Sequence, residues 1–216
     1  LTTLCKDSEP SVRTAAALAL GLLGTHGAPA IGSLTALLKD GDVKVGITAA
    51  KALGEMGKAA AEAVPALIES VEAIEDVSRL GLRYEAIRSI GRIASGEEDV
   101  QTFLNELLDS QDGSARIVAA CELSRTNTDV DRIVPVILEG LSLLDDDGMR
   151  ARAADALGRI GPEVLKADST VVGKLLELAE ESDDSLRMAA ARALVNIDPN
   201  ASAQLPAELL LRISGG

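Results

Sequence analysis

The chain has 216 residues, of which 47% are hydrophobic and only 1% aromatic, and its formal net charge is −13. This length and hydrophobic share allow a substantial buried core and exclude a disordered composition, and the scarcity of aromatic residues favours close-packed helices over a β-sandwich. The acidic charge argues against a general binder of nucleic acid or of anionic membranes, since both need basic surface.

Six segments repeat one pattern along the chain. In each, the second residue is apolar and is followed, in five of the six, by arginine, then by small residues and usually a glycine. In chain order they are Ser11–Gly24, Lys44–Gly57, Gly81–Ala94, Ser114–Asn127, Gly148–Gly161 and Ser185–Asp198. Their anchor positions are Arg13, Gly46, Arg83, Arg116, Arg150 and Arg187, separated by 33, 37, 33, 34 and 37 residues. So steady a period predicts one supersecondary unit copied along the chain.

A second amphipathic stretch lies beside each anchored segment. In chain order these are Ala30–Asp40, Ala63–Ile74, Asp99–Asp109, Arg132–Leu144, Ser169–Glu181 and Gln204–Ile213. Their apolar residues recur at three- and four-residue intervals, as on a buried helix face. Each unit is therefore predicted to be helix A (the second stretch), an acidic turn, and helix B (the anchored segment). Pro65, Pro135 and Pro206 are expected in the first turns of A helices, where a missing N–H costs little.

Several positions within the units have predicted structural roles. Three, seven and ten residues after the anchor lie residues of the buried stripe, such as Ala16, Leu20 and Leu23 in the first unit and Ala153, Leu157 and Ile160 in the fifth. The glycine eight residues after the anchor recurs at Gly21, Gly54, Gly91 and Gly158 and indicates close approach of neighbouring helices. Turn carboxylates are expected to cap the B helices. They include Asp7, Asp40, Asp42, Glu75, Asp76, Asp112, Asp145, Asp146, Asp147, Asp183 and Asp184.

The pattern resembles HEAT repeats, in the short bacterial form shared with the phycobilisome-lyase-like HEAT family. The residues that carry this resemblance are VPALI at Val64–Ile68, its counterpart Val134–Leu138, the turn Leu37–Val45 and the B segment Ala49–Gly57. The resemblance implies an all-α, right-handed α-solenoid of about six helical hairpins, with A helices on the convex face and B helices on the concave face. It also implies one domain over residues 1–216, with units at about 1–27 (partial), 28–61, 62–97, 98–128, 129–164, 165–200 and 201–216 (a partial cap).

The same resemblance implies a structural role for the anchor arginines. In HEAT repeats this arginine typically reaches turn carboxylates of its own or a neighbouring unit. We therefore expect Arg13, Arg83, Arg116, Arg150 and Arg187 to brace the turns, because a guanidinium makes several charge-assisted hydrogen bonds at once. Gly46 replaces the arginine in the second unit, and the turn near Val77 departs from the pattern.

Positions two, five and nine after the anchor share the opposite face of helix B, which we call the B-helix stripe. Its acidic members are Glu55, Glu85 and Asp155, and its basic members are Lys51, Arg88, Arg92, Arg125, Arg152, Arg159 and Arg192. Seven cations and three acids give the stripe a formal charge of +4, whereas the whole chain carries −13. The stripe is either the basic floor of a partner-binding groove or a solvated face with mixed pairs such as Arg152 and Asp155.

Leu18 and Leu22 interrupt the polar stripe in the first unit. Two interpretations stay open for them. They are either covered by upstream repeats, which we favour, or form an exposed apolar contact site.

The sequence predicts no catalytic, cofactor-binding or metal-binding residue. His26 is the only histidine, which leaves no His-rich zinc site and no His–Glu dyad for a di-iron centre. Cys5 and Cys121 lack metal-ligand spacing, no phosphate-binding glycine loop occurs, and aromatic platforms for stacking bases are missing.

We therefore expect a non-catalytic scaffold or adaptor that binds a protein or peptide, including an acidic one, through the concave face of the B helices. Three alternatives stay open: a phycobilisome-lyase-like subunit acting on a chromophore-bearing protein, an architectural spacer within a larger multidomain protein, and a HEAT-like DNA repair enzyme. The last conflicts with the acidic charge, so no nucleic-acid or membrane partner is expected. A monomer or a part of a longer chain is expected, and the cytoplasm is slightly favoured as its location.

Overall fold

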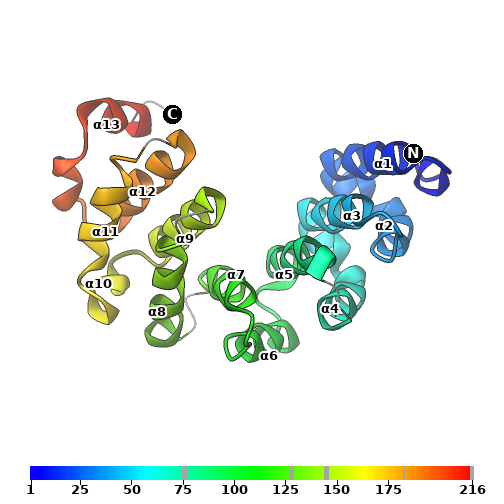
Figure 1. The fold of residues 1–216 in the computed structure, drawn as a ribbon, viewed down its shortest axis with the longest axis horizontal. Coiled ribbons are helices and arrows are strands. Elements are labelled where there is room, and N and C mark those ends of the chain that lie inside the picture. The colour runs from blue at the N-terminus through cyan, green and yellow to red at the C-terminus, as the bar shows by residue number, and fades with distance from the viewer. Residues whose placement is uncertain (74–76, 127–128, 144–145, 182, 215–216) are drawn as a thin grey trace. The chain divides into compact units, whose positions relative to one another are not determined.

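The computed structural model describes residues 1–73, 77–126, 129–143, 146–181 and 183–214. These residues form helices and turns, and none of them lies in a β-strand. They divide into two compact units, unit 1 at Leu1–Glu106 and unit 2 at Leu107–Gly216 (Figure 1).

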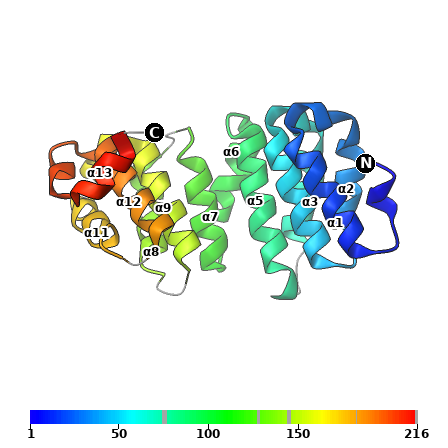
Figure 2. The same ribbon diagram turned by 90° about the horizontal axis from the view of Figure 1, so that it is seen from above.

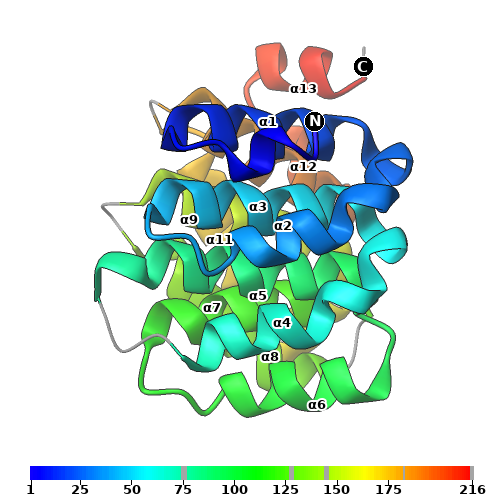
Figure 3. The same ribbon diagram turned by 90° about the vertical axis from the view of Figure 1, so that its right-hand side faces the viewer.

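Unit 1 has two layers of helices (Figures 1 and 3). Its B layer contains α1 (Pro10–Leu22), α3 (Val43–Met56) and α5 (Leu80–Ala94), and its A layer contains α2 (Ile31–Leu37), α4 (Val64–Glu72) and α6 (Glu98–Leu107). Short 3-10 helices occupy Leu4–Lys6, Gly24–Ala30, Gly57–Ala63 and Val77–Arg79. Helix α3 packs against both α1 and α5, while α2 packs on α3 and α4 packs on α5. Successive hairpins therefore stack B helix against B helix.

Unit 2 repeats this arrangement (Figures 1 and 2). Its B helices are α7 (Gly113–Leu123), α9 (Asp147–Ile160) and α12 (Asp184–Ile197). Its A helices are α8 (Val130–Leu141), α11 (Val171–Leu178) and α13 (Ala207–Ser214), with a short α10 at Val164–Ala167 and 3-10 helices at Gly161–Glu163 and Ala201–Gln204. Helix α9 packs on α7, α8 and α12, and α11 packs on α12. The predicted all-α solenoid of helical hairpins is confirmed, whereas the sense of its superhelix stays a prediction.

The buried stripe of the B helices follows the predicted spacing, with one exception. Ala16 and Leu20 of α1 are buried, and so are Ala153, Leu157 and Ile160 of α9. Leu23 was expected in the core, but it is 46% exposed. The reason is local: α1 ends at Leu22, and Gly24 adopts a left-handed φ of 53°, which turns the chain away from the helix axis.

The recurrent mid-helix glycines mark close contacts between B helices, as predicted. A Cβ atom on Gly21 would lie 2.9 Å from Cα of Ala52, and one on Gly158 would lie 2.8 Å from Cα of Ala193. A Cβ atom on Gly54 would lie 2.7 Å from the Ser89 hydroxyl. Real Cβ contacts of this length do not occur, so glycine allows these helix pairs to pack closely.

Turn carboxylates cap four B helices. The carboxylate of Asp42 accepts hydrogen bonds from the backbone N–H groups of Lys44 and Val45 at the start of α3. Asp112, Asp146 and Asp183 accept equivalent bonds at the starts of α7, α9 and α12. The expectation of aspartate caps is confirmed for these helices, while Glu75, Asp76 and Asp145 lie outside the described residues.

Anchor arginines hold the turns in place. Arg13 donates to both carboxylate oxygens of Asp40, at 2.7 and 2.8 Å, and to the backbone carbonyl of Asp7 at 2.8 Å. Arg116 donates to the backbone carbonyl of Ser110 and to Glu139. Arg150 donates to the backbone carbonyl of Leu141 and to Asp147 and Glu181. Arg187 donates to the backbone carbonyl of Ala179 and to Glu208. The bracing role is confirmed for these four of the five anchor arginines, and for Arg83 it stays a prediction.

The Arg13–Asp40 pair makes the stability of unit 1 depend on pH. Its hydrogen bond holds the pKa of Asp40 below the ordinary value. The ionised carboxylate therefore stabilises the fold fully above the unfolded-state pKa of about 4, and this contribution is lost as the pH falls through the lower folded-state pKa. We expect Asp40→Asn to lower the free energy of unfolding at neutral pH, and the deficit to shrink on acidification. Urea unfolding at several pH values measures this, and a deficit independent of pH would contradict it.

Candidate binding face of the B helices

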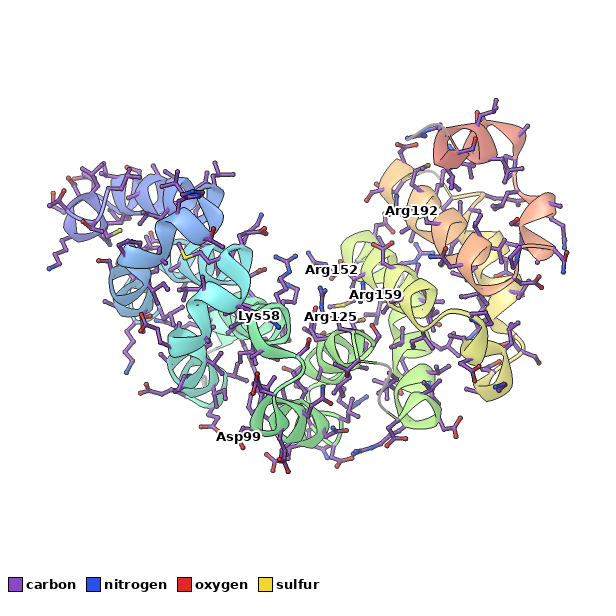
Figure 4. The ribbon with its side chains drawn as sticks, turned by 180° about the vertical axis from the view of Figure 1, so that it is seen from behind. Lys58, Asp99, Arg125, Arg152, Arg159 and Arg192 are labelled. Atoms are coloured by element: carbon purple, nitrogen blue, oxygen red, sulfur yellow. The ribbon has the colours of Figure 1, made fainter. Side chains whose placement is uncertain are left out.

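The cations of the B-helix stripe belong to two separate sets. Lys51, Arg88 and Arg92 extend from α3 and α5 of unit 1, whereas Arg125, Arg152, Arg159 and Arg192 extend from α7, α9 and α12 of unit 2. Six of the seven are exposed, and Arg88 is the half-buried one. Figure 4 shows the four arginines of unit 2 on the same side of their helices.

In unit 1, two of the three stripe cations are neutralised by stripe acids. Arg88 binds Glu85 one turn earlier on α5, and its side chain is only 15% exposed. Arg92 reaches from α5 to Glu55 on α3, at 2.8 Å. Lys51 forms no ion pair within the part of the chain that the structure describes. Arg88 is therefore a structural residue, and Lys51 is the cation available to a partner.

A groove of about 410 Å³ lies beside Lys51, between α1 and α3. Leu18 and Leu22 of α1 line it together with Thr48, Lys51 and Glu55 of α3. Leu18 is 49% exposed and Leu22 is 81% exposed. These five residues stand at positions two, five or nine of their helices, so the structure gathers stripe positions of the first two units around one groove.

In unit 2, one stripe cation is paired across helices and another within its own helix. Arg192 of α12 binds Asp155 of α9 at 3.2 Å. Arg125 binds Glu122 one turn earlier on α7, at 2.5 Å. Asp155, which the sequence placed near Arg152, is therefore bound to the next repeat, and Arg152 itself is exposed.

Arg159 is the stripe cation with the most unusual surroundings. It reaches from α9 to the C-terminal end of α7, where it donates to the Ser124 hydroxyl at 3.1 Å and to the backbone carbonyl of Cys121 at 2.9 Å. Burial lowers the pKa of its guanidinium, and the nearby Arg125 cation lowers this pKa further. Arg159 thus donates to two neutral oxygen atoms beside a second cation, while the more weakly acting carboxylates of Glu122 and Asp155 raise its pKa.

Two ion pairs of the stripe join equal positions of adjacent repeats, a relation that the sequence-based predictions did not include. Glu55 and Arg92 both stand nine residues after their anchors, and Asp155 and Arg192 both stand five after theirs. We call such a same-position pair on neighbouring B helices a rung. Such pairs could have been found by aligning the repeats, because residues of opposite charge stand at the same position of neighbouring units.

Other chemistry-bearing residues form no site among the described residues. His26 is exposed in the 3-10 helix after α1, and Cys5 and Cys121 are buried free thiols. Burial raises the pKa of the Cys5 thiol, which disfavours the reactive thiolate. Within the described ranges, no three His, Cys, Asp or Glu side chains are grouped as a metal site would require. None of the helices described there is long and apolar enough to span a membrane.

Comparisons with known proteins agree with this architecture. Two engineered proteins solved by the Northeast Structural Genomics Consortium match 92% of this chain with a TM-score of 0.55, at 23% and 22% identity over 95% and 97% of their own chains. A designed armadillo repeat protein matches 91% of this chain, and 98% of its own, with a TM-score of 0.47 at 16% identity. At these identities the first two matches show the fold alone. No curated protein matches the chain.

Family models cover most of the sequence. A model of HEAT repeats matches residues 31–124, 101–194 and 134–212, and a model of the single HEAT repeat matches residues 1–27. Together they include the anchored segments of all six units. The chain therefore belongs to the HEAT repeat family.

Proposed function

We propose that this chain is a non-catalytic HEAT-repeat scaffold that binds an acidic segment of a protein or peptide through the B-helix stripe, chiefly in unit 2. The observation that carries this proposal is the rung formed by Arg125 and Arg159. Both stand nine residues after their anchors on adjacent helices, so this rung pairs two cations where the Glu55–Arg92 rung pairs opposite charges. Glu122 neutralises Arg125, and Arg159 binds only neutral oxygens.

A partner carboxylate at this rung would improve the electrostatics of the folded chain. Arg159 donates only to a hydroxyl and to a backbone carbonyl, and the neighbouring Arg125 cation repels its positive charge. Guanidinium and carboxylate groups form short, charge-assisted hydrogen bonds, and two such bonds can form in parallel. The net charge of −13 repels an acidic segment from the rest of the surface, so charge also determines where such a segment binds.

A matched pair of double variants tests this proposal. Arg159→Gln with Arg192→Gln removes two stripe cations, whereas Arg132→Gln with Lys166→Gln removes two exposed cations from α8 and α10 of the same unit. The probe is a labelled glutamate-rich peptide of about 10 residues, long enough to cross three helices spaced about 10 Å apart. We expect the stripe variant to weaken binding about tenfold or more in fluorescence anisotropy and the control to change it less than about threefold.

Equal binding by the two double variants would contradict the proposal, and so would equal binding of a lysine-rich peptide by the unmodified chain. Two of the alternatives give other results. The phycobilisome-lyase-like role rests on resemblance alone and predicts visible chromophore absorbance that copurifies with the chain. A spacer role predicts no saturable binding of either peptide.

A further inference from the structure

We propose that the groove between α1 and α3 is a second docking site, which receives an amphipathic helix of a partner protein with apolar side chains next to a carboxylate. This inference rests on the proposed scaffold function, but it concerns unit 1 and a different chemistry. The groove combines two exposed leucines with a lysine that has no carboxylate partner among the described residues.

The rungs of the other repeats show what α1 lacks. At position nine, Arg92 of α5 binds Glu55 of α3, and at position five, Arg192 of α12 binds Asp155 of α9. In both rungs the cation belongs to the later helix and the carboxylate to the earlier one. Two of the seven stripe cations, Arg92 and Arg192, are therefore paired with an acid at the same position of the preceding repeat.

Helix α1 offers no carboxylate at either of these two positions. Lys51 stands at position five of α3, and the same position of α1 is Leu18 rather than an acid. Position nine of α1 is Leu22, next to Glu55, whose charge is already taken by Arg92. Lys51 therefore faces an apolar edge of α1 and not a carboxylate.

The groove has the shape of a helix-binding surface. Its floor is formed by Gly21 and Ala52, where the two helices pack so closely that a Cβ atom on Gly21 would lie 2.9 Å from Cα of Ala52. Leu18 and Leu22 stand one turn apart on one wall, and Lys51 stands on the other. Small residues between two ridges leave a channel into which the side chains of a third helix can pack.

Charge complementarity selects the partner. Apolar side chains at i and i+4 of the incoming helix would cover Leu18 and Leu22, which are 49% and 81% exposed in the free chain. A glutamate or aspartate flanking them would pair with Lys51 and restore the missing rung. A helix with lysine or arginine at that place would leave Lys51 beside a like charge.

The experiment selects peptides of about 18 residues, or five helical turns, from a displayed random library on the unmodified chain. The Leu22→Glu variant is used for counter-selection, to remove peptides that bind elsewhere on the chain. Leu211→Glu is the matched control. Leu211 is also a helical leucine that is 72% exposed, but it lies on α13 of unit 2. We expect the selected peptides to share apolar residues at i and i+3 or i+4 with a neighbouring acid. Leu22→Glu should weaken their binding at least about tenfold, and Leu211→Glu less than about twofold.

Lys51→Glu tests the charge, since it should turn the preference from a glutamate-bearing to a lysine-bearing peptide. Methyl NMR spectra of the leucines should shift at Leu18 and Leu22 and not at Leu211. Selected peptides without acids, or peptides bound equally by Leu22→Glu, would overturn the inference. So would a concentration-dependent dimer abolished by Leu22→Glu, because the occupant would then be a second copy. If the Arg159→Gln/Arg192→Gln variant still weakened binding of the glutamate-rich peptide in such a case, the proposed function would stand.

Discussion

Replacing Arg150 by alanine is expected to lower the free energy of unfolding of unit 2 by about 3 kcal/mol, among the larger effects of single substitutions. Arg150 is only 6% exposed. Its guanidinium donates to the backbone carbonyl of Leu141 at 3.3 Å, and to Asp147 and Glu181 at 2.9 Å each. The hydrogen bond to Glu181 ties α9 to the next hairpin and raises the pKa of Arg150. Alanine would break all three bonds and leave a cavity between hairpins.

The control for this prediction is Arg132→Ala in α8. Arg132 is an exposed arginine whose ion pair with the largely exposed Asp109 is worth less than about 1 kcal/mol. Native-state hydrogen exchange of the backbone amides of α9 and α12 measures the effect of each variant on the stability of unit 2. It is preferable to a single melting curve, because repeat arrays need not unfold in one step. Equal protection in the two variants would show that Arg150 does not brace the hairpins.

The repeat architecture could be predicted because it depends on local and periodic signals. Apolar spacing, aspartates before each B helix and small residues at fixed positions all act within one repeat, and they are copied six times. Pro135 shows the limit of such signals. The prediction placed it in a first turn, but α8 starts at Val130, after a left-handed Asp129, so Pro135 lies inside the helix. The helix starts earlier than its apolar periodicity indicates, because Asp131 and Arg132 are polar residues of its first turn.

The binding face was harder to predict, because a helical period gives the side of a helix and not the depth at which a neighbour covers it. Arg88 shares its stripe position with Lys51 and Arg192, yet its side chain is turned onto Glu85 and is 15% exposed. The approach of Arg159 to the end of α7 likewise depends on the packing of two helices 24 residues apart in the chain, Leu123 to Asp147. Only the structure separates cations held by carboxylates from those that are not.

Gly158→Ala is the second substitution with a large expected effect, and it tests whether close packing of B helices sets the geometry of the face. In an isolated helix, alanine is favoured over glycine by about 1 kcal/mol. In this chain, the added Cβ would lie 2.8 Å from Cα of Ala193 on α12, so one helix must move away from the other. We expect this strain to outweigh the helix propensity and to destabilise unit 2 by about 1–3 kcal/mol.

Gly173→Ala provides the opposite expectation in the same unit. Gly173 lies within α11, and a Cβ there would meet no atom within 4 Å, so alanine should stabilise the unit by up to about 1 kcal/mol. Urea unfolding of the two variants should therefore give changes of opposite sign. Stabilisation by both substitutions would mean that α9 and α12 can separate at little cost. The distance across their rung, from Arg192 to Asp155, would then be set by side-chain flexibility rather than by the glycine contact.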